Sequence, residues 1–261
     1  MTDELRLSVS KTKCFSQCKA QFNFNYNLKL PKKERDYHIF GKFCHKVLED
    51  FHLAYINGSD KPFHEMMGIS FKVALEEFGA SMTKEMKKEC WDLINKYLKI
   101  VTVEKSKNLS SNVIACEKNF SIFLKDNLIL NGFIDRIQID ADNVIHVADY
   151  KTTKNKKYLK SDWFQLLTYA YVIHLENPMI EVVRASYILL RHDFEYITTE
   201  FKIPEILSIK DKYIDYAVKI LGETEYAPSP TILCKYCDYL EFCDAGKAHV
   251  KPDTTYGEIT Y

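Results

Sequence analysis

Two β-strand patterns joined by a short polar turn constrain this chain more than any other sequence feature. Leu128–Asp140 and Asn143–Lys151 are rich in β-branched and aromatic residues, with partial alternation of apolar and polar side chains. The sequence Ala141-Asp142 between them is typical of a turn. We therefore predict that the two segments form an antiparallel hairpin.

The predicted hairpin gathers two carboxylates and a lysine on one surface. Side chains alternate across a strand, so Asp149 and Lys151 share one face while Tyr150 points the other way. Asp135 lies on the preceding strand, and the midpoint between positions 135 and 149 falls inside the predicted turn. Antiparallel pairing therefore places the two carboxylates nearly opposite one another.

This arrangement suits a divalent cation. Two neighbouring carboxylates repel each other, and an ion that prefers oxygen ligands stabilises them. Magnesium or manganese bound there would hold a scissile phosphate and lower the pKa of a bound water. Lys151 would orient or help deprotonate that water, and the Tyr150 carbonyl could supply another ligand. The alternative is a solvated cluster of salt bridges, which an Asp-x-Lys beside another Asp often forms.

The order of the other predicted elements indicates an α/β fold with a mixed central sheet and an N-terminal helical lobe. We divide one domain into a mainly helical lobe (1–110), an α/β core (111–225) and a cysteine-rich tail (226–261). Apolar periodicity predicts helices from Ser8 or Ser10 to about Tyr26 and over Phe40–Ile56, Phe63–Phe78, Met82–Lys105, Ser161–Glu176 and Pro204–Leu221. Further strands are predicted over Asn112–Leu124, Val182–Arg191 and Phe194–Phe201.

Four residues outside the hairpin are candidates to complete a site. His45 lies near the start of the second predicted helix, and Glu117 lies in the strand before the hairpin. Gln165 and Tyr169 stand one helical turn apart on the helix that follows the hairpin. Each has an ordinary explanation as well: His45 could be a core residue hydrogen-bonded to Glu49, and the other three could be solvated polar groups.

A lysine-rich loop follows the hairpin directly. Five lysines occur in the ten residues from Lys151 to Lys160, and Lys154, Lys156 and Lys157 would suit contacts to phosphates. The chain as a whole has 36 basic and 36 acidic residues. Zero net charge argues against a polybasic binder but leaves room for a local basic groove.

Three cysteines close to the C-terminal end form the strongest signal outside the hairpin. The sequence has no signal-peptide pattern and no apolar run long enough to span a membrane, so we expect a cytoplasmic protein with no membrane partner. In a reducing compartment, Cys234-x2-Cys237-x5-Cys243 indicates bound metal, either zinc or an iron–sulfur cluster. The fourth ligand stays open among the other cysteines: Cys14, Cys18, Cys44, Cys90 and Cys116.

Several motifs in this order resemble the RecB-family nucleases of the PD-(D/E)XK superfamily. The resemblance runs from about Leu7 to Cys243, and the layout is most similar to the iron–sulfur members, namely the CRISPR-associated RecB-like exonucleases and the AddB nuclease domain. The motifs are Leu7-Ser-Val-Ser-Lys, Cys18, Gly41-x-x-x-His45, Gly132-x-x-Asp135, Asp149-Tyr-Lys151, Gln165-x-x-x-Tyr169 and the three clustered cysteines.

The resemblance implies a role for each matching residue. His45, Asp135 and Asp149 would bind the metal together with the Tyr150 carbonyl, and Lys151 would be the catalytic lysine. Glu117 would be an additional acid, while Gln165 and Tyr169 would support the lysine and contact DNA. The ligands of a structural 4Fe–4S cluster would be Cys18, Cys234, Cys237 and Cys243. Lys19 follows Cys18 where proline is frequent in the family, so Cys14, one helical turn earlier, could replace Cys18.

The expected activity is that of a magnesium- or manganese-dependent deoxyribonuclease with a restriction-endonuclease-like core. We expect a single-strand DNA exonuclease in DNA processing, in repair and recombination or in CRISPR adaptation. Because the sequence has no Walker loop, unwinding would come from a helicase or another partner protein. The alternatives are a non-catalytic DNA-binding subunit that keeps the fold, and a zinc protein with a scaffold role.

Overall fold

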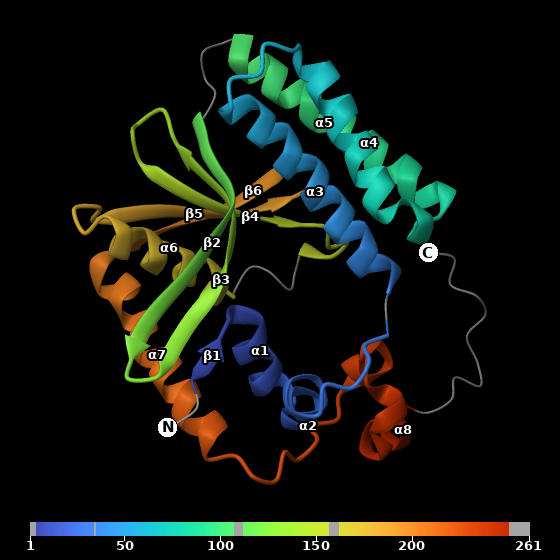
Figure 1. Ribbon diagram of the computed structural model, residues 1–261, viewed down its shortest axis with the longest axis vertical. Coiled ribbons are helices and arrows are strands. Elements are labelled where there is room, and N and C mark those ends of the chain that lie inside the picture. Colours follow the sequence, from blue (N-terminus) through green and yellow to red (C-terminus); the bar gives the residue numbers. More distant parts are fainter. Residues whose placement is uncertain (1–3, 34, 107–111, 157–161, 251–261) are drawn as a thin grey trace. The chain divides into compact units, whose positions relative to one another are not determined.

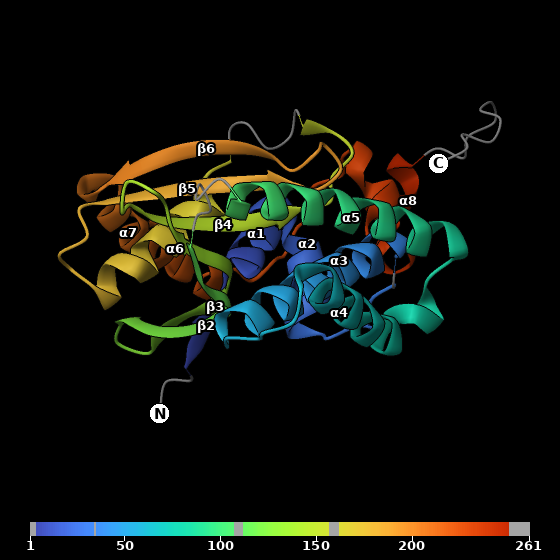
Figure 2. The same cartoon turned by 90° about the horizontal axis from the view of Figure 1, so that it is seen from above.

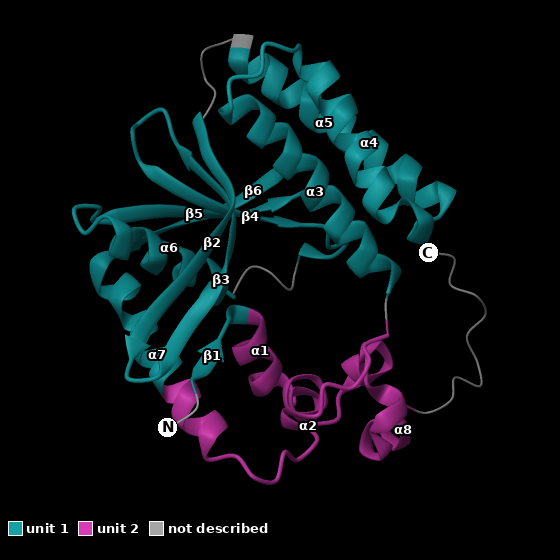
Figure 3. Ribbon diagram, in the orientation of Figure 1, with its two compact units in different colours: residues 1–9, 35–214 teal, residues 10–34, 215–261 magenta. Residues whose placement is uncertain are grey.

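The chain folds into two compact units that each combine distant stretches of sequence (Figure 3). The computed structural model describes residues 4–33, 35–106, 112–156 and 162–250. The core unit consists of Met1–Val9 and Arg35–Ile214, and the cysteine unit consists of Ser10–Glu34 and Asp215–Tyr261. The predicted three-part division at residues 110 and 225 stays a prediction.

Helices dominate the first part of the described chain and strands the middle (Figure 1). The strands are β1 (Leu5–Leu7), β2 (Asn112–Lys125), β3 (Leu128–Ile139), β4 (Ile145–Lys151), β5 (Val182–Leu189) and β6 (Glu195–Lys202). The α-helices are α1 (Val9–Gln17), α2 (Lys19–Phe22), α3 (Asp36–Ile56), α4 (Phe63–Phe78), α5 (Lys84–Ser106), α6 (Phe164–Glu176), α7 (Ile203–Leu221) and α8 (Asp244–His249). A π-helical turn covers Asn23–Asn27, and short 3₁₀ helices cover Gly79–Ser81, Ile232–Tyr236 and Leu240–Phe242.

The core unit is built on a six-stranded mixed sheet in the order β1-β3-β4-β5-β6, with β2 paired to β3 off this path. Strand β2 pairs antiparallel along the whole length of β3 and so occupies one of its edges. On the other edge, β1 pairs parallel with Leu128–Leu130, and β4 pairs antiparallel with Arg136–Ile139. Between these two stretches, β3 has no strand partner on that edge among the described residues. The mixed sheet confirms the predicted fold class.

The hairpin of β3 and β4 confirms the register predicted from the sequence. Arg136 pairs with Ala148 and Ile139 pairs with Ile145, so the hairpin is centred on residue 142. At the turn, the Asn143 amide donates to the Asp140 carbonyl at 2.9 Å. Asn143 has φ +62°, a left-handed conformation that asparagine tolerates better than most residues.

Helices cover both faces of the sheet in the core unit (Figure 2). On one face, Ala148 and Tyr150 of β4 join a buried apolar cluster with residues of α3, α4 and α5. On the other face, Asp149 and Lys151 reach Gln165 of α6. This two-sided packing explains why β4 is buried along most of its length. None of the described helices is both long and apolar enough to span a membrane.

The structure differs from the sequence-based expectation at two places. Strand β1 was not predicted, because three residues carry too little pattern to be recognised. The first helix is not continuous to Tyr26: Cys18 is extended, with φ −160° and ψ 112°, and separates α1 from α2. Helical hydrogen bonds continue on both sides of the break, from the Cys18 amide to Cys14 and from the Phe22 amide to Cys18. The apolar periodicity therefore gave no sign of it.

We expect Gly132→Ala to destabilise the core unit. A Cβ at this position in β3 would lie 2.8 Å from Cζ of Phe120, which is buried on the neighbouring strand. Overpacking of this kind costs about 1–3 kcal/mol. Thermal unfolding should show a lower midpoint, and Phe120→Leu should recover part of the loss in the double variant. A Gly132→Ala protein as stable as wild type would contradict the close packing.

Candidate active site

The candidate site lies where β3 and β4 separate. The backbone ladder between them ends at Arg136 and Ala148, one pair before Asp135 and Asp149 would meet. Beyond this point the Tyr150 amide donates to Oδ2 of Asp135 at 3.0 Å. The carboxylate therefore takes the place of a backbone acceptor, which holds it in a gap in the sheet with only 8% of the residue exposed.

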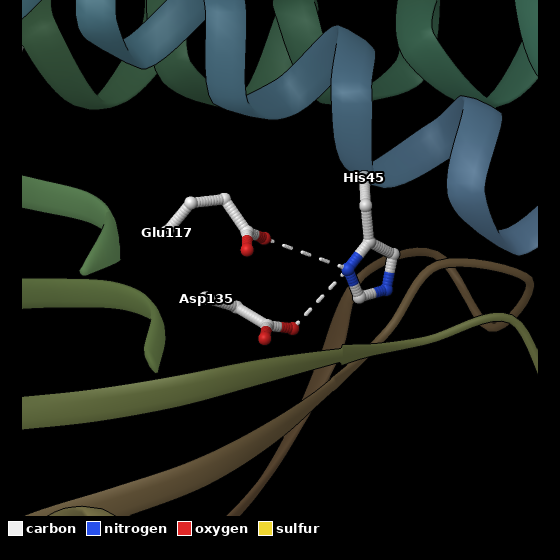
Figure 4. A group of neighbouring side chains, drawn as sticks. All are labelled: His45, Glu117 and Asp135. Atoms are coloured by element: carbon white, nitrogen blue, oxygen red, sulfur yellow. Dashed lines mark ion pairs between the residues drawn. The ribbon is translucent and has the colours of Figure 1, made fainter. Parts of the chain in front are cut away.

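Three potential ligands converge at this gap from three elements: His45 from α3, Glu117 from β2 and Asp135 from β3 (Figure 4). One ligand atom of each lies within 4.8 Å of those of the other two. Nδ1 of His45 is 3.3 Å from Oδ2 of Asp135 and 4.0 Å from Oε1 of Glu117. The other ring nitrogen of His45, Nε2, lies 3.0 Å from the Tyr150 carbonyl oxygen.

Glu117 reaches this group through an irregularity in β2. Its neighbours Cys116 and Lys118 pair with Arg136 and Ile134, so Glu117 stands opposite Asp135 in register. Glu117 has φ +44°, which is strained for a residue with a long side chain. Strained backbone of this kind is common at functional sites, and here it accompanies the carboxylate that turns toward His45.

The two acids of this group are difficult to ionise together. Burial, followed by repulsion from Asp149 and Glu117, raises the pKa of Asp135 well above its ordinary value. Burial and the negative charge of Glu49 raise the pKa of Glu117 to about 7. Burial lowers the pKa of His45, despite the opposing effect of Asp149. A bound cation would favour the ionised acids and the neutral imidazole, which are the forms that bind metals.

Asp149 and Lys151 form a second group beside the first, on the face toward α6. Nζ of Lys151 lies 2.5 Å from Oδ2 of Asp149 and donates to Oε1 of Gln165 at 3.0 Å. The Gln165 amide donates to Oδ1 of Asp149 at 2.5 Å and to the Tyr169 hydroxyl at 2.8 Å. Gln165 thus fixes both the acid and the lysine, and its spacing from Tyr169 on the helix could be predicted from the sequence.

Tyr187 is a neighbour of Lys151 that sequence reasoning missed. The Lys151 ammonium lies 5.2 Å from the centre of the Tyr187 ring, which stacks in turn on Trp163 at 5.7 Å. Burial lowers the pKa of Lys151, but the ion pair with Asp149 outweighs it, and the net shift is upward. In the sequence, an aromatic residue in an apolar strand indicates only the core, so no signal pointed to this contact.

The donor set fits a divalent cation. His45, Glu117 and Asp135 offer one nitrogen and two carboxylates, and the Tyr150 carbonyl lies against the other ring nitrogen of His45. Oδ2 of Asp149 is buried and has no well-directed hydrogen bond from a described residue, although the Lys151 ammonium is at ion-pair distance. A buried carboxylate oxygen without a well-directed hydrogen bond is suited to bind a metal ion.

The predicted phosphate-binding lysines have different surroundings. Lys154 is exposed in the loop after β4. Lys156 is partly buried and forms an ion pair with Glu195 at the start of β6. Lys157 lies outside the described residues. Of the two described lysines, Lys154 is thus the one presented to solvent as the sequence suggested.

The cysteine unit contains a cavity of about 340 Å³. Its lining includes Cys18, Cys234, Cys237 and Cys243, the four cysteines expected to bind a cluster. Two of the sulfurs accept backbone amides at 3.3 Å, Cys234 from Thr231 and Cys243 from Gly246. Amide hydrogen bonds of this kind stabilise cysteine thiolates around iron–sulfur clusters. The four cysteines that the sequence suggested as ligands therefore line one cavity.

The other described cysteines lie apart from this lining. Cys14 is in the same unit, and burial raises the pKa of its thiol to about 11. Cys44 and Cys90 are fully buried in the helical core, with their sulfurs 3.2 Å apart. Cys116 is in β2 of the core unit, where burial raises the pKa of the thiol to about 12.

Comparisons with known proteins agree with this fold. A profile of the PD-(D/E)XK nuclease superfamily matches residues 6–244, which is nearly the whole chain. Comparison with curated proteins gives no match. A crystal structure of a provisionally assigned exonuclease from Eubacterium rectale superimposes with a TM-score of 0.54 at 12% identity, covering 97% of this chain and 91% of that one. The structure of SSO0001 gives 0.39 at 15% identity, with coverages of 94% and 89%.

A mixed sheet with acids and a lysine at the point where two strands separate defines a nuclease fold. The chain belongs to the PD-(D/E)XK nuclease superfamily.

Proposed function

We propose that this protein is a magnesium- or manganese-dependent deoxyribonuclease. The observation that carries the proposal is the convergence of His45, Glu117 and Asp135 beside the ion pair of Asp149 and Lys151. Metal-binding groups beside a lysine whose ammonium is fixed in place suit phosphodiester hydrolysis, because negative charge develops on the phosphate and must be stabilised.

The side chains of the candidate site have separate roles in the proposed reaction. His45, Glu117, Asp135, Asp149 and the Tyr150 carbonyl would hold the ion. When bound, magnesium or manganese polarises a phosphate oxygen and lowers the pKa of a bound water. The Lys151 ammonium is held by Asp149 and Gln165, so its charge can offset the charge that develops on the phosphate. Tyr169 supports the position of Gln165.

We also propose a 4Fe–4S cluster in the cysteine unit. Its ligands would be Cys18, Cys234, Cys237 and Cys243, because all four line one cavity and Cys14 does not. The cluster would join the N-terminal helices to the C-terminal segment and so have a structural role. A reducing compartment such as the cytoplasm would preserve it.

Within this reaction class we favour an exonuclease that acts on single-stranded DNA. The Eubacterium rectale structure is described as an exonuclease, and exposed Lys154 offers a phosphate contact near the site. Lys156 and Lys157 are proposed to assist it. A helicase, or partners in recombination or CRISPR adaptation, would supply the single strand.

The alternative is a non-catalytic subunit that keeps the fold and binds DNA. Such a relative would be expected to lose an acid or the lysine. Here Asp135, Asp149 and Lys151 are all present, and Gln165 contacts both members of the ion pair. These contacts favour the enzyme.

Cleavage should be measured on three substrates with anaerobically prepared protein: an end-labelled single strand, a circular single strand and a linear duplex. We expect manganese- or magnesium-dependent degradation of the linear single strand, no activity in EDTA, and little cleavage of the circle. Cleavage of the circle would contradict the exonuclease mode. Absence of cleavage with either metal, together with intact DNA binding, would support the non-catalytic alternative.

A further inference from the structure

Two phenylalanines are unusually exposed on the β2–β3 hairpin of the core unit. Phe123 is 72% exposed and Phe133 is 54% exposed. Exposing large apolar side chains to water is unfavourable in free energy, so two of them on one face of the hairpin are candidates for a binding surface.

Both rings project from the same face of the hairpin. Asn119 pairs with Phe133 and Ser121 pairs with Asn131. Phe123 pairs with Ile129. Asn119, Ser121 and Phe123 are all exposed, as strict alternation along β2 requires.

The opposite face of the hairpin is part of the core. Phe120 and Leu124 alternate with the exposed residues of β2 and are buried. Gly132 of β3 faces Phe120 so closely that a methyl group would not fit. The two exposed rings therefore do not result from a strand that is apolar throughout.

This exposed face continues into the candidate active site. Phe133 precedes Asp135 by two residues on β3, so both side chains leave the strand on the same side, roughly 7 Å apart along it. Asn119 likewise follows Glu117 by two residues on β2. Phe123 lies further along the hairpin, roughly 13 Å from the level of Phe133.

We propose that Phe133 and Phe123 form a stacking platform for the bases of a single-stranded nucleic acid whose backbone enters the active site. This inference rests on the proposed nuclease function and names the residues that would hold the single-stranded substrate of that site. Aromatic rings stack on any base, so such a platform binds without sequence preference. The side chains between the rings, Asn119, Ser121 and Asn131, are neutral hydrogen-bonding groups that suit base edges and sugars.

The chemistry of the platform selects an unpaired strand. In a duplex, the flat faces of the bases are stacked on one another and cannot meet a protein ring. In a single strand they are accessible, and the stacking energy becomes available for binding. A nucleic acid whose bases stack along β2 and β3 would place a phosphate near Asp135, which lies two residues beyond Phe133 on β3. The platform thus explains a single-strand preference without base-specific contacts.

The test is equilibrium binding in EDTA, where no metal-dependent cleavage can occur. The probes are a fluorescent oligothymidine and an abasic strand of the same length, at one fixed salt concentration. We expect wild-type protein to bind oligothymidine more tightly than the abasic strand. Phe133→Leu and Phe123→Leu keep apolar volume but remove the ring, and each should weaken oligothymidine binding roughly 5- to 150-fold. Neither should change binding of the abasic strand, and Phe133→Trp should retain wild-type affinity.

Tyr196→Leu is the matched control, because Tyr196 is a 40% exposed aromatic on β6 of the same sheet. It should bind both probes as wild type does. Unchanged oligothymidine affinity in both leucine variants, or equal losses on both probes, would overturn the platform. A changed sedimentation coefficient with unchanged DNA affinity would overturn it too, since the face would then contact protein. Binding in EDTA is independent of cleavage, so wild-type protein without nuclease activity would contradict only the proposed function.

Discussion

Lys151→Met is expected to lower the rate of DNA cleavage by a factor on the order of 10²–10⁴, because it removes the ammonium that contacts both Asp149 and Gln165. Methionine keeps the length and apolar body of the lysine. DNA affinity in EDTA should change little, since the substitution removes a single positive charge. Single-turnover cleavage of an end-labelled strand with manganese is the measurement.

Lys96→Met provides the control for this prediction. Lys96 is on α5 and forms an exposed ion pair with Asp193, so its loss should leave the cleavage rate unchanged. Circular dichroism should show that both variants are folded. A Lys151→Met protein that cleaves at the wild-type rate would contradict the role assigned to the lysine.

For the proposed 4Fe–4S cluster, Cys18→Ser is expected to abolish or strongly reduce iron binding, whereas Cys14→Ser should leave it near the wild-type level. The two residues lie one helical turn apart, but only Cys18 is extended and lines the cysteine cavity. Absorbance near 400 nm and iron analysis after anaerobic purification measure the difference. Loss of the cluster should also lower the unfolding midpoint, because metal binding contributes to folding.

The paired cysteine variants separate three possibilities. Equal iron loss in both would mean that the N-terminal helices lose their fold, and a reversed pattern would assign the ligand to Cys14. A colourless wild-type protein with stoichiometric zinc would contradict the iron–sulfur proposal itself. Manganese-dependent cleavage by the Cys18→Ser protein would agree with a structural role for the cluster.

The hairpin and its acids could be predicted because they depend on local geometry. Alternation along β4 and the position of the turn fix the register, which places Asp135 and Asp149 at the same level. The spacing of Gln165 and Tyr169 on one helix likewise needs no tertiary information. These short-range relations can therefore be predicted from the spacing of residues in the sequence.

Other features of the site depend on contacts that no local pattern encodes. Strands β4 and β5 pair in parallel through the intervening α6, and this pairing brings Tyr187 beside Lys151. His45 reaches the gap only because α3 packs on the sheet. The left-handed backbone of Glu117 leaves no trace in its amino-acid type, because glutamate is not a residue that favours this conformation.

The cysteine unit joins residues 10–34 to residues 215–250, and the longer segment of the core unit, residues 35–214, lies between them in sequence. Within it, the Tyr239 hydroxyl donates to Asn25 at 2.9 Å, and Lys19 forms an ion pair with Glu223. During synthesis on the ribosome, the first helices therefore leave the exit tunnel long before the residues that complete their unit. All described strands of the sheet lie before residue 215, so we expect the sheet to form first and the cysteine unit to fold last. A chain arrested before residue 215 is expected to contain these strands and to expose the apolar side of its first helices.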